Sequence, residues 1–135
     1  MNVGRFLVAV IGVFVVRTGL NFLYYGVAMK EKFEGLIAEY PGVFREGIAG
    51  FIVTDLLFAL VLVYLWVKAG AAFGTGAQGG AIWGLWIGVL VGVVGGLYWY
   101  FSFAFYTPAD YAMEAVYQVV SLVIQGAVAG LIYKR

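Results

Sequence analysis

The sequence contains neither cysteine nor histidine. These absences exclude disulfides, iron–sulfur clusters, zinc sites of the Cys/His type and histidine-ligated haem. They also remove the side chain best suited to proton transfer near neutral pH. Only carboxylates, Lys, Tyr, Ser and Thr are left for enzyme chemistry, and no catalytic constellation of them is visible. We therefore expect no cofactor, no metal and no enzyme activity.

Charge is also scarce, because only 11% of the 135 residues are charged while 64% are hydrophobic. A soluble domain usually carries about 25% charged residues. So few charges cannot cover a surface against water, and the mean hydropathy of +1.00 points to the lipid bilayer as the partner. The formal net charge of +1 provides no basic field, so we expect no nucleic-acid binding.

Long apolar runs are abundant, and each approaches the roughly 20 residues that span a bilayer as a helix. The runs are continuous, whereas a β-barrel would show short alternating segments. The sequence predicts an all-α, up-down bundle of four transmembrane helices with short loops, forming a single integral membrane domain over residues 1–135. The expected helices cover about 6–27, 47–67, 79–101 and 111–133, and the first is a retained helix because Arg17-Thr18-Gly19 is no signal-peptide cleavage site.

The connections carry turn signals and most of the charge. A short interfacial helix is expected before Pro41-Gly42, and Thr107-Pro108-Ala109-Asp110 is a turn with an acidic helix start. The side that holds both termini has four basic residues, Arg5, Lys68, Lys134 and Arg135. The other side has three, Lys30, Lys32 and Arg45, together with the acidic residues Glu31, Glu34, Glu39, Glu46 and Asp110. The positive-inside rule favours cytoplasmic termini, in a bacterial inner membrane.

Tyrosine and tryptophan gather near the expected span ends, where an apolar ring with one polar group suits the membrane interface. We interpret them as two interfacial belts rather than a ligand cage. One belt holds Tyr24, Tyr25, Tyr98, Trp99, Tyr100, Phe101 and Tyr106, and the other Tyr64, Trp66, Trp83 and Tyr133.

Arg17 and Asp55 lie within apolar runs, where each charge costs about 2.5–3.5 kcal/mol. At 1.5 Å per residue their depths are roughly 15 and 12 Å on consecutive antiparallel helices. This predicts an intramembrane ion pair, with Glu114 as the alternative partner of Arg17 and Asn21 completing the hydrogen bonds of Arg17. The pair has two interpretations: it binds a substrate or a proton, or it only holds the two helices together. We favour the structural interpretation.

A polar stripe follows the last span. Its five residues lie within about an 80° arc at 100° per residue, so the stripe must avoid lipid. Together with Arg17, Asn21, Thr54 and Asp55 it either forms a pocket or serves as interhelical hydrogen-bond glue, and the sequence leaves both open. The stripe consists of Asp110, Glu114, Gln118, Ser121 and Gln125.

Glycine recurs every fourth residue along the third span, at Gly76, Gly80, Gly84, Gly88, Gly92 and Gly96. Such a row lets another backbone approach closely. Gly126 and Gly130 offer a matching face on the last span, and a helix of another chain is the alternative. Because five intervals exceed one crossing, we expect part of the row to contact another chain or a lipid.

Several features together resemble the small four-helix bacterial membrane proteins grouped as families of unknown function. They are Arg5-Phe6, Tyr25-Gly26, the glycine-stepped third helix, Glu114 and the ending Gly130-Leu131-Ile132-Tyr133. Those families often place a histidine near the end of the first helix, where this chain has Tyr25. The resemblance implies a four-helix membrane fold, and it gives no information about an activity.

The sequence supports two functional hypotheses. The first is a helix-packing or accessory subunit, in a homo-oligomer or a larger membrane complex, based on the glycine row and the short loops. The alternative is a small oligomeric transporter or channel that uses Arg17, Asp55 and Glu114 for an ion or small polar solute.

Overall fold

The computed structural model describes residues 1–45 and 47–134, and these residues form helices and connecting loops without strands. Glu46 and Arg135 of the charge count lie outside the described residues. The elements are α1 (Val3–Leu23) with a π-helical turn η1 (Tyr24–Ala28), α2 (Lys30–Glu39), α3 (Ala49–Ala69) with a 3₁₀ turn η2 (Gly70–Phe73), α4 (Gly76–Gly88), a π-helical segment η3 (Val89–Val94), α5 (Gly95–Ser102) and α6 (Pro108–Ile132).

Four continuous helical segments are long and apolar enough to cross a membrane, which confirms the predicted all-α four-helix bundle. They are Val3–Ala28, Ala49–Phe73, Gly76–Ser102 and Pro108–Ile132. The predicted short helix before Pro41-Gly42 is α2. The last helix begins at Pro108 rather than 111, because Thr107 caps it. Thr107 Oγ1 accepts from the Asp110 backbone N–H at 3.2 Å, and the Asp110 carboxylate accepts from the Thr107 N–H at 3.1 Å.

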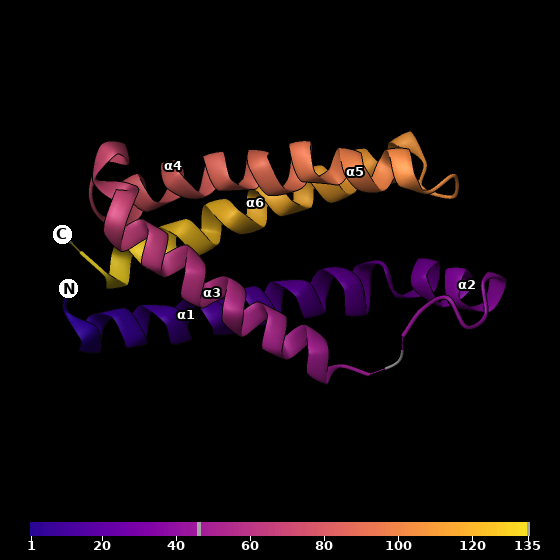
Figure 1. Ribbon diagram of the computed structural model, residues 1–135, viewed down its shortest axis with the longest axis horizontal. Coiled ribbons are helices and arrows are strands. Elements are labelled where there is room, and N and C mark those ends of the chain that lie inside the picture. Colours follow the sequence, from indigo (N-terminus) through magenta and orange to yellow (C-terminus); the bar gives the residue numbers. More distant parts are fainter. Residues whose placement is uncertain (46, 135) are drawn as a thin grey trace.

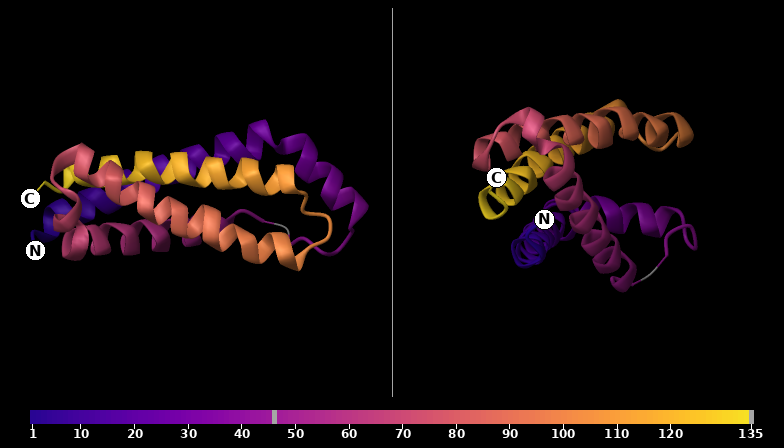
Figure 2. Two further views of the ribbon diagram at one scale, coloured as in Figure 1. Left: turned by 90° about the horizontal axis from the view of Figure 1, so that it is seen from above. Right: turned by 60° about the vertical axis from the view of Figure 1, so that its left-hand side comes forward.

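The helices run up and down, so both chain termini lie at one end of the bundle and α2 lies at the other (Figure 1). We call these the terminal end and the loop end. α4 and α5 run beside α6 over its length, whereas α3 crosses α1 and diverges from the other helices towards the loop end (Figures 1 and 2). Exposure follows this divergence, since Phe51 near the start of α3 is 70% exposed while Val63 further along is fully buried.

The apolar core occupies the terminal end and draws residues from α1, α3, α4 and α6. Three aromatic residues expected in an interfacial belt, Trp66, Trp83 and Tyr133, are buried in this core, so that interpretation is wrong for them. Trp66 Nε1 donates to the Tyr133 carbonyl at 3.2 Å, and the Tyr133 hydroxyl accepts from the Asn2 backbone N–H at 3.1 Å. Trp66 and Tyr133 can be buried because their polar groups find partners inside the protein, whereas Trp83 Nε1 has no hydrogen-bond partner among the described residues.

The glycine row of α4–α5 lies against α6. A Cβ added at Gly80 or Gly84 would lie 2.0 Å from a carbonyl oxygen of α6, that of Gly126 or Leu122. At Gly88 and Gly92 it would meet α6 atoms at 2.8 and 2.7 Å. The ends of the row are also occupied, since a Cβ at Gly130 would lie 2.1 Å from the Gly76 oxygen and a Cβ at Gly96 would lie 3.0 Å from the Tyr111 ring.

Five of the six glycines, from Gly80 to Gly96, therefore face α6 of the same chain, whereas nothing lies within 4 Å of a Cβ at Gly76. Contact of the row with another chain or a lipid stays a prediction. The π-helical segment η3 helps to explain why these five glycines face α6. A four-residue step in an α-helix drifts by about 40°. A π-helical turn holds more residues and rotates less per residue, so it reduces this drift and keeps Gly92 and Gly96 turned towards α6.

Candidate functional site

The buried charges meet between α1 and α3. Arg17 Nε lies 2.9 Å from Asp55 Oδ1, and the two side chains are only 11% and 9% exposed. The guanidinium also lies over the Phe58 ring, 3.8 Å from its centroid. The predicted ion pair with Asp55 is confirmed, and Glu114 has other partners.

The remaining lone pairs of Asp55 are used by α1. Asn21 Nδ2 donates to Oδ1 at 3.0 Å and Thr18 Oγ1 donates to Oδ2 at 3.2 Å. Asn21 therefore binds the Asp55 carboxylate. The sequence had predicted that Asn21 would bind Arg17, and that prediction is wrong. Arg17 Nη1 is buried without a hydrogen-bond partner among the described residues. Thr54 does not join this cluster, because its side chain is exposed and donates to the Gly50 carbonyl on its own helix at 2.7 Å.

Tyr117 ties this cluster to α6. Its hydroxyl donates to Asn21 Oδ1 at 2.6 Å, and its ring stacks on Tyr24 with the centroids 3.9 Å apart. Sequence reasoning missed Tyr117, although a signal existed. At 100° per residue, Tyr117 lies only about 20° outside the arc of the polar stripe.

A second polar cluster lies nearer the loop end. The Tyr25 hydroxyl donates to Glu114 Oε1, and Gln118 Nε2 lies 3.1 Å from the same oxygen and 3.3 Å from the Tyr25 hydroxyl. The rings of Tyr25 and Tyr117 meet edge to face at 5.7 Å, so the two clusters are in contact. Both Tyr24 and Tyr25 belong to η1, and π-helical turns are frequent at functional sites.

The polar stripe of α6 divides into parts with different roles. Ser121 and Gln125 are buried towards the terminal end and bond to each other, with Gln125 Nε2 donating to Ser121 Oγ at 2.9 Å. They have no part in a pocket and belong to the core. Glu114 and Asp110, by contrast, line a cavity at the loop end. The hydrogen-bond glue is therefore present in one half of α6. The cavity in the other half is not the predicted pocket, because Arg17, Asn21, Thr54 and Asp55 do not line it.

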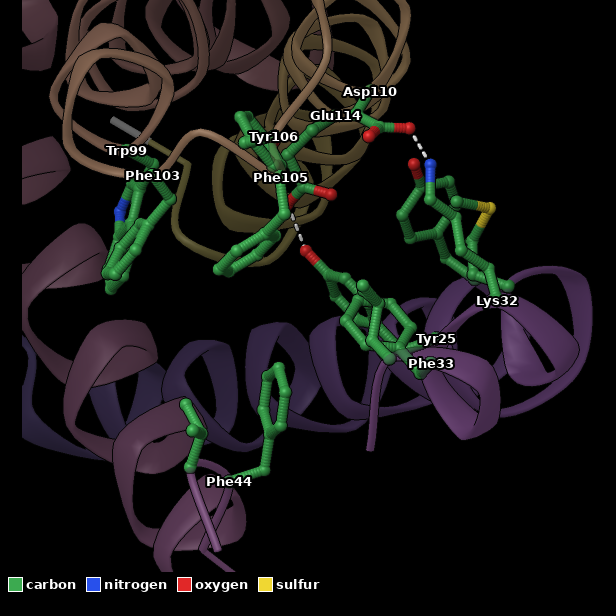
Figure 3. Close-up of a pocket in the computed structure, with 14 residues that line it drawn as sticks. Tyr25, Lys32, Phe33, Phe44, Trp99, Phe103, Phe105, Tyr106, Asp110 and Glu114 are labelled. Atoms are coloured by element: carbon green, nitrogen blue, oxygen red, sulfur yellow. Dashed lines mark hydrogen bonds and ion pairs between the residues drawn. The ribbon is translucent and has the colours of Figure 1, made fainter. Parts of the chain in front are cut away.

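The loop-end cavity has a volume of about 450 Å³. It lies between η1, α2, α5, the loop that follows α5, and the start of α6 (Figure 3). Eight of its fourteen lining residues are aromatic, so this end of the molecule forms an aromatic cage and not only an interfacial belt. The eight are Tyr24, Tyr25, Phe33, Phe44, Trp99, Phe103, Phe105 and Tyr106. Tyr98 and Phe101, at 77% and 79% exposed, keep the position expected of a belt.

The cavity has an excess of negative charge. Lys32 pairs with Asp110 at its rim, as the dashed line in Figure 3 shows. Glu114 has no cationic partner among the residues that the structure describes. Tyr106, which lies in the loop outside the membrane-spanning segments, responds to this environment. Burial raises the pKa of its hydroxyl, and the nearby Glu114 carboxylate raises that pKa further.

The described residues hold no cluster of three or more acidic side chains that could bind a metal ion. The chemistry available is therefore binding by a carboxylate, aromatic rings and tyrosine hydroxyls, linked inward to the Arg17–Asp55 pair. No protein-family model, no curated protein and no solved structure matches the chain.

Proposed function

We propose that this chain is a small membrane transporter or channel that takes an ion or small polar solute from the loop end into its polar interior. One observation carries this proposal. Two hydrogen-bonded clusters in contact lead from the cavity, at Glu114, to the ion pair at Asp55. Charged side chains within a membrane are functional-site candidates by default, because they face the bundle interior or a watery cavity and mark ion and substrate pathways.

The two polar clusters connect to a cavity at the loop end only. Towards the terminal end, the apolar core closes the bundle with fully buried side chains such as Val13, Val63 and Leu122. A site that is open to one side and sealed on the other is what alternating access requires of one state. With both termini in the cytoplasm of a bacterial inner membrane, the cavity would open to the periplasmic side.

An accessory subunit, within a homo-oligomer or a larger complex, is the second candidate. Most of the glycine row gives it little support, because Gly80 to Gly96 lie against α6 of the same chain. The observation that favours it now is the loop-end half of α3, where Phe51, Val53 and Leu57 are 70%, 57% and 57% exposed. Purification in mild detergent tests this role, since a stoichiometric co-purifying protein would support it.

Charge movement across reconstituted liposomes tests the transport proposal. Solid-supported membrane electrophysiology would follow concentration jumps of H⁺, Na⁺, K⁺ and methylammonium. We expect a current above that of protein-free liposomes with at least one of them. The double variant Arg17→Gln with Asp55→Asn, which removes both charges together, should lower this current. The absence of a current with all four cations and with 2-phenylethylammonium would overturn transport of a cation.

A further inference from the structure

We propose that the loop-end cavity binds an organic ammonium ion that carries an aromatic or similarly apolar body. This inference rests on the proposed function, because it names the class of solute for the same site. It is drawn from the charge, the lining and the size of the cavity, each of which points to the same chemistry.

The charge of the cavity selects a cation. Its lining includes two carboxylates, Asp110 and Glu114, and a single amine, Lys32. Lys32 pairs with Asp110, which leaves Glu114 with hydrogen bonds from Tyr25 and Gln118 and without a counter-ion in the described part of the chain. These two donors are neutral, so they orient the carboxylate without cancelling its charge. A ligand ammonium would supply the missing positive charge.

The aromatic lining selects an organic cation rather than a bare metal ion. Figure 3 shows Trp99, Phe103 and Phe105 on one side of the cavity and Tyr25 and Phe33 on the other. Within each group the rings are in contact, with Trp99 stacked on Phe103 at 5.5 Å and Tyr25 edge to face with Phe33 at 5.7 Å. Ring faces attract ammonium groups, and proteins recognise such groups in sites lined by aromatic rings. Divalent metal ions such as Ca²⁺ are usually bound by several carboxylates, and the described residues hold no cluster of three or more acidic side chains.

The size of the cavity fits a ligand of this class. Its volume of about 450 Å³ lies within the range of roughly 300–1,000 Å³ that is typical of small-molecule sites. A single inorganic ion would leave most of the aromatic surface uncovered. An ammonium with an apolar body fills the space and covers the rings. Both a free amine and the ammonium headgroup of a lipid have this chemistry.

Two probes of nearly equal shape, one charged and one neutral, separate the effect of charge on binding from the effect of shape. Isothermal titration calorimetry of the full chain in detergent, at neutral pH, would compare 2-phenylethylammonium with the neutral 2-phenylethanol. We expect the cation to bind at least about tenfold more tightly. Equal affinities of the two probes would overturn the inference.

Glu114→Gln tests the residue that carries the argument. Its side-chain oxygen can still accept from Tyr25, so retained binding of 2-phenylethanol shows that the cavity is intact. We expect the preference for the cation to fall to about twofold or less. The control Glu39→Gln removes an exposed carboxylate outside the cavity and should leave the preference unchanged. If Glu114→Gln loses both probes, Glu114→Asp, which keeps the charge but withdraws it, should still lower the preference. An unchanged preference in Glu114→Gln, or in Glu114→Asp where the Gln variant binds neither probe, would overturn the inference.

Nanodiscs distinguish the two sources of the ammonium group. In phosphatidylethanolamine the lipid headgroup would compete, so 2-phenylethylammonium should bind more weakly than in a neutral galactolipid if the lipid is the occupant. Equal affinities assign the site to a soluble amine. The two proposals also fail separately. Binding of the ammonium without any current would leave the ligand class standing and remove transport. A current without ammonium binding would support transport and overturn the ligand class.

Discussion

Two pairs of helices cross the same apolar layer, and their contacts differ in chemistry. One pair is α4–α5 with α6, and the other is α1 with α3. In the first pair, glycines bring two backbones together over most of the length, as at Gly80 and Gly126. In the second, apolar side chains meet near the terminal end and a charged cluster holds the helices at one depth, through Arg17 and Asp55. Lipid is as apolar as these helices, so neither pair is held by hydrophobic burial alone.

This difference explains where the cavity lies. Close backbone contact holds α6 against the chain from Gly80 to Gly92, and a space opens only beyond it, where the Tyr111 ring separates Gly96 of α5 from the α6 backbone. The ion pair is directional and acts at one level, so α3 can diverge from the bundle beyond it. The aromatic cage lies at this looser end, near Tyr25 and Glu114. The apolar core and the cavity therefore occupy opposite ends of the same bundle.

The largest effect is expected from breaking the backbone contact. Gly84→Leu would place a side chain where even a Cβ would lie 2.0 Å from the Leu122 carbonyl oxygen. We expect a loss of more than about 3 kcal/mol in stability, followed by circular dichroism during unfolding in mixed detergent micelles. Gly19→Leu is the matched control, because nothing lies within 4 Å of a Cβ at Gly19. Equal stability of the two variants would mean that α6 does not pack on this row.

The next effect comes from breaking the ion pair. Asp55→Asn leaves the Arg17 charge buried and uncompensated, and we expect it to cost about 3 kcal/mol in the same unfolding measurement. The double variant Arg17→Gln with Asp55→Asn should lose less than this single variant, because no lone charge remains. Losses that simply add would show that the two residues act independently.

A smaller loss of stability is expected from the hydrogen bond that joins the two pairs of helices, between Tyr117 of α6 and Asn21 of α1. Tyr117→Phe removes the hydroxyl that donates to Asn21 at 2.6 Å and keeps the ring that stacks on Tyr24. Hydrogen bonds between membrane helices contribute about 0.6 kcal/mol on average, so we expect a loss of that order. Tyr98→Phe, at a side chain that is 77% exposed, should have no effect. A loss as large as that of Asp55→Asn would make Tyr117 part of the charged cluster itself.

The smallest effect is expected at the mouth of the cavity. Burial and then Glu114 raise the pKa of Tyr106 above its ordinary value of 10.0. The folded protein therefore holds this proton more tightly. The resulting stabilisation is present below pH 10.0 and is lost as the pH rises through the raised pKa of the folded state. Tyrosinate absorbance, titrated in the parent and in Tyr106→Phe, should differ by one group that ionises above pH 10.0. A difference that titrates at or below this value would contradict the burial of Tyr106.

The charged and glycine residues were accessible to sequence reasoning because depth along an apolar run is a local property. Arg17 and Asp55 lie at matching depths, and their contact followed from the antiparallel order of the helices. The tyrosines of the site were not accessible in this way. Tyr24 and Tyr25 read as an interfacial belt, and only the π-helical turn η1 brings both towards α6.

The sequence by itself determined the four spans, the short helix α2 and the need for close contact along the glycine row, because hydropathy and residue size act one segment at a time. Only the tertiary structure decided that α6 packs against most of this row, that Trp66 is buried in the core, and that Glu114 faces an aromatic cavity. These outcomes depend on how far each helix rotates about its axis and where α3 diverges. Both are set by contacts between residues far apart in the chain, which no single segment contains.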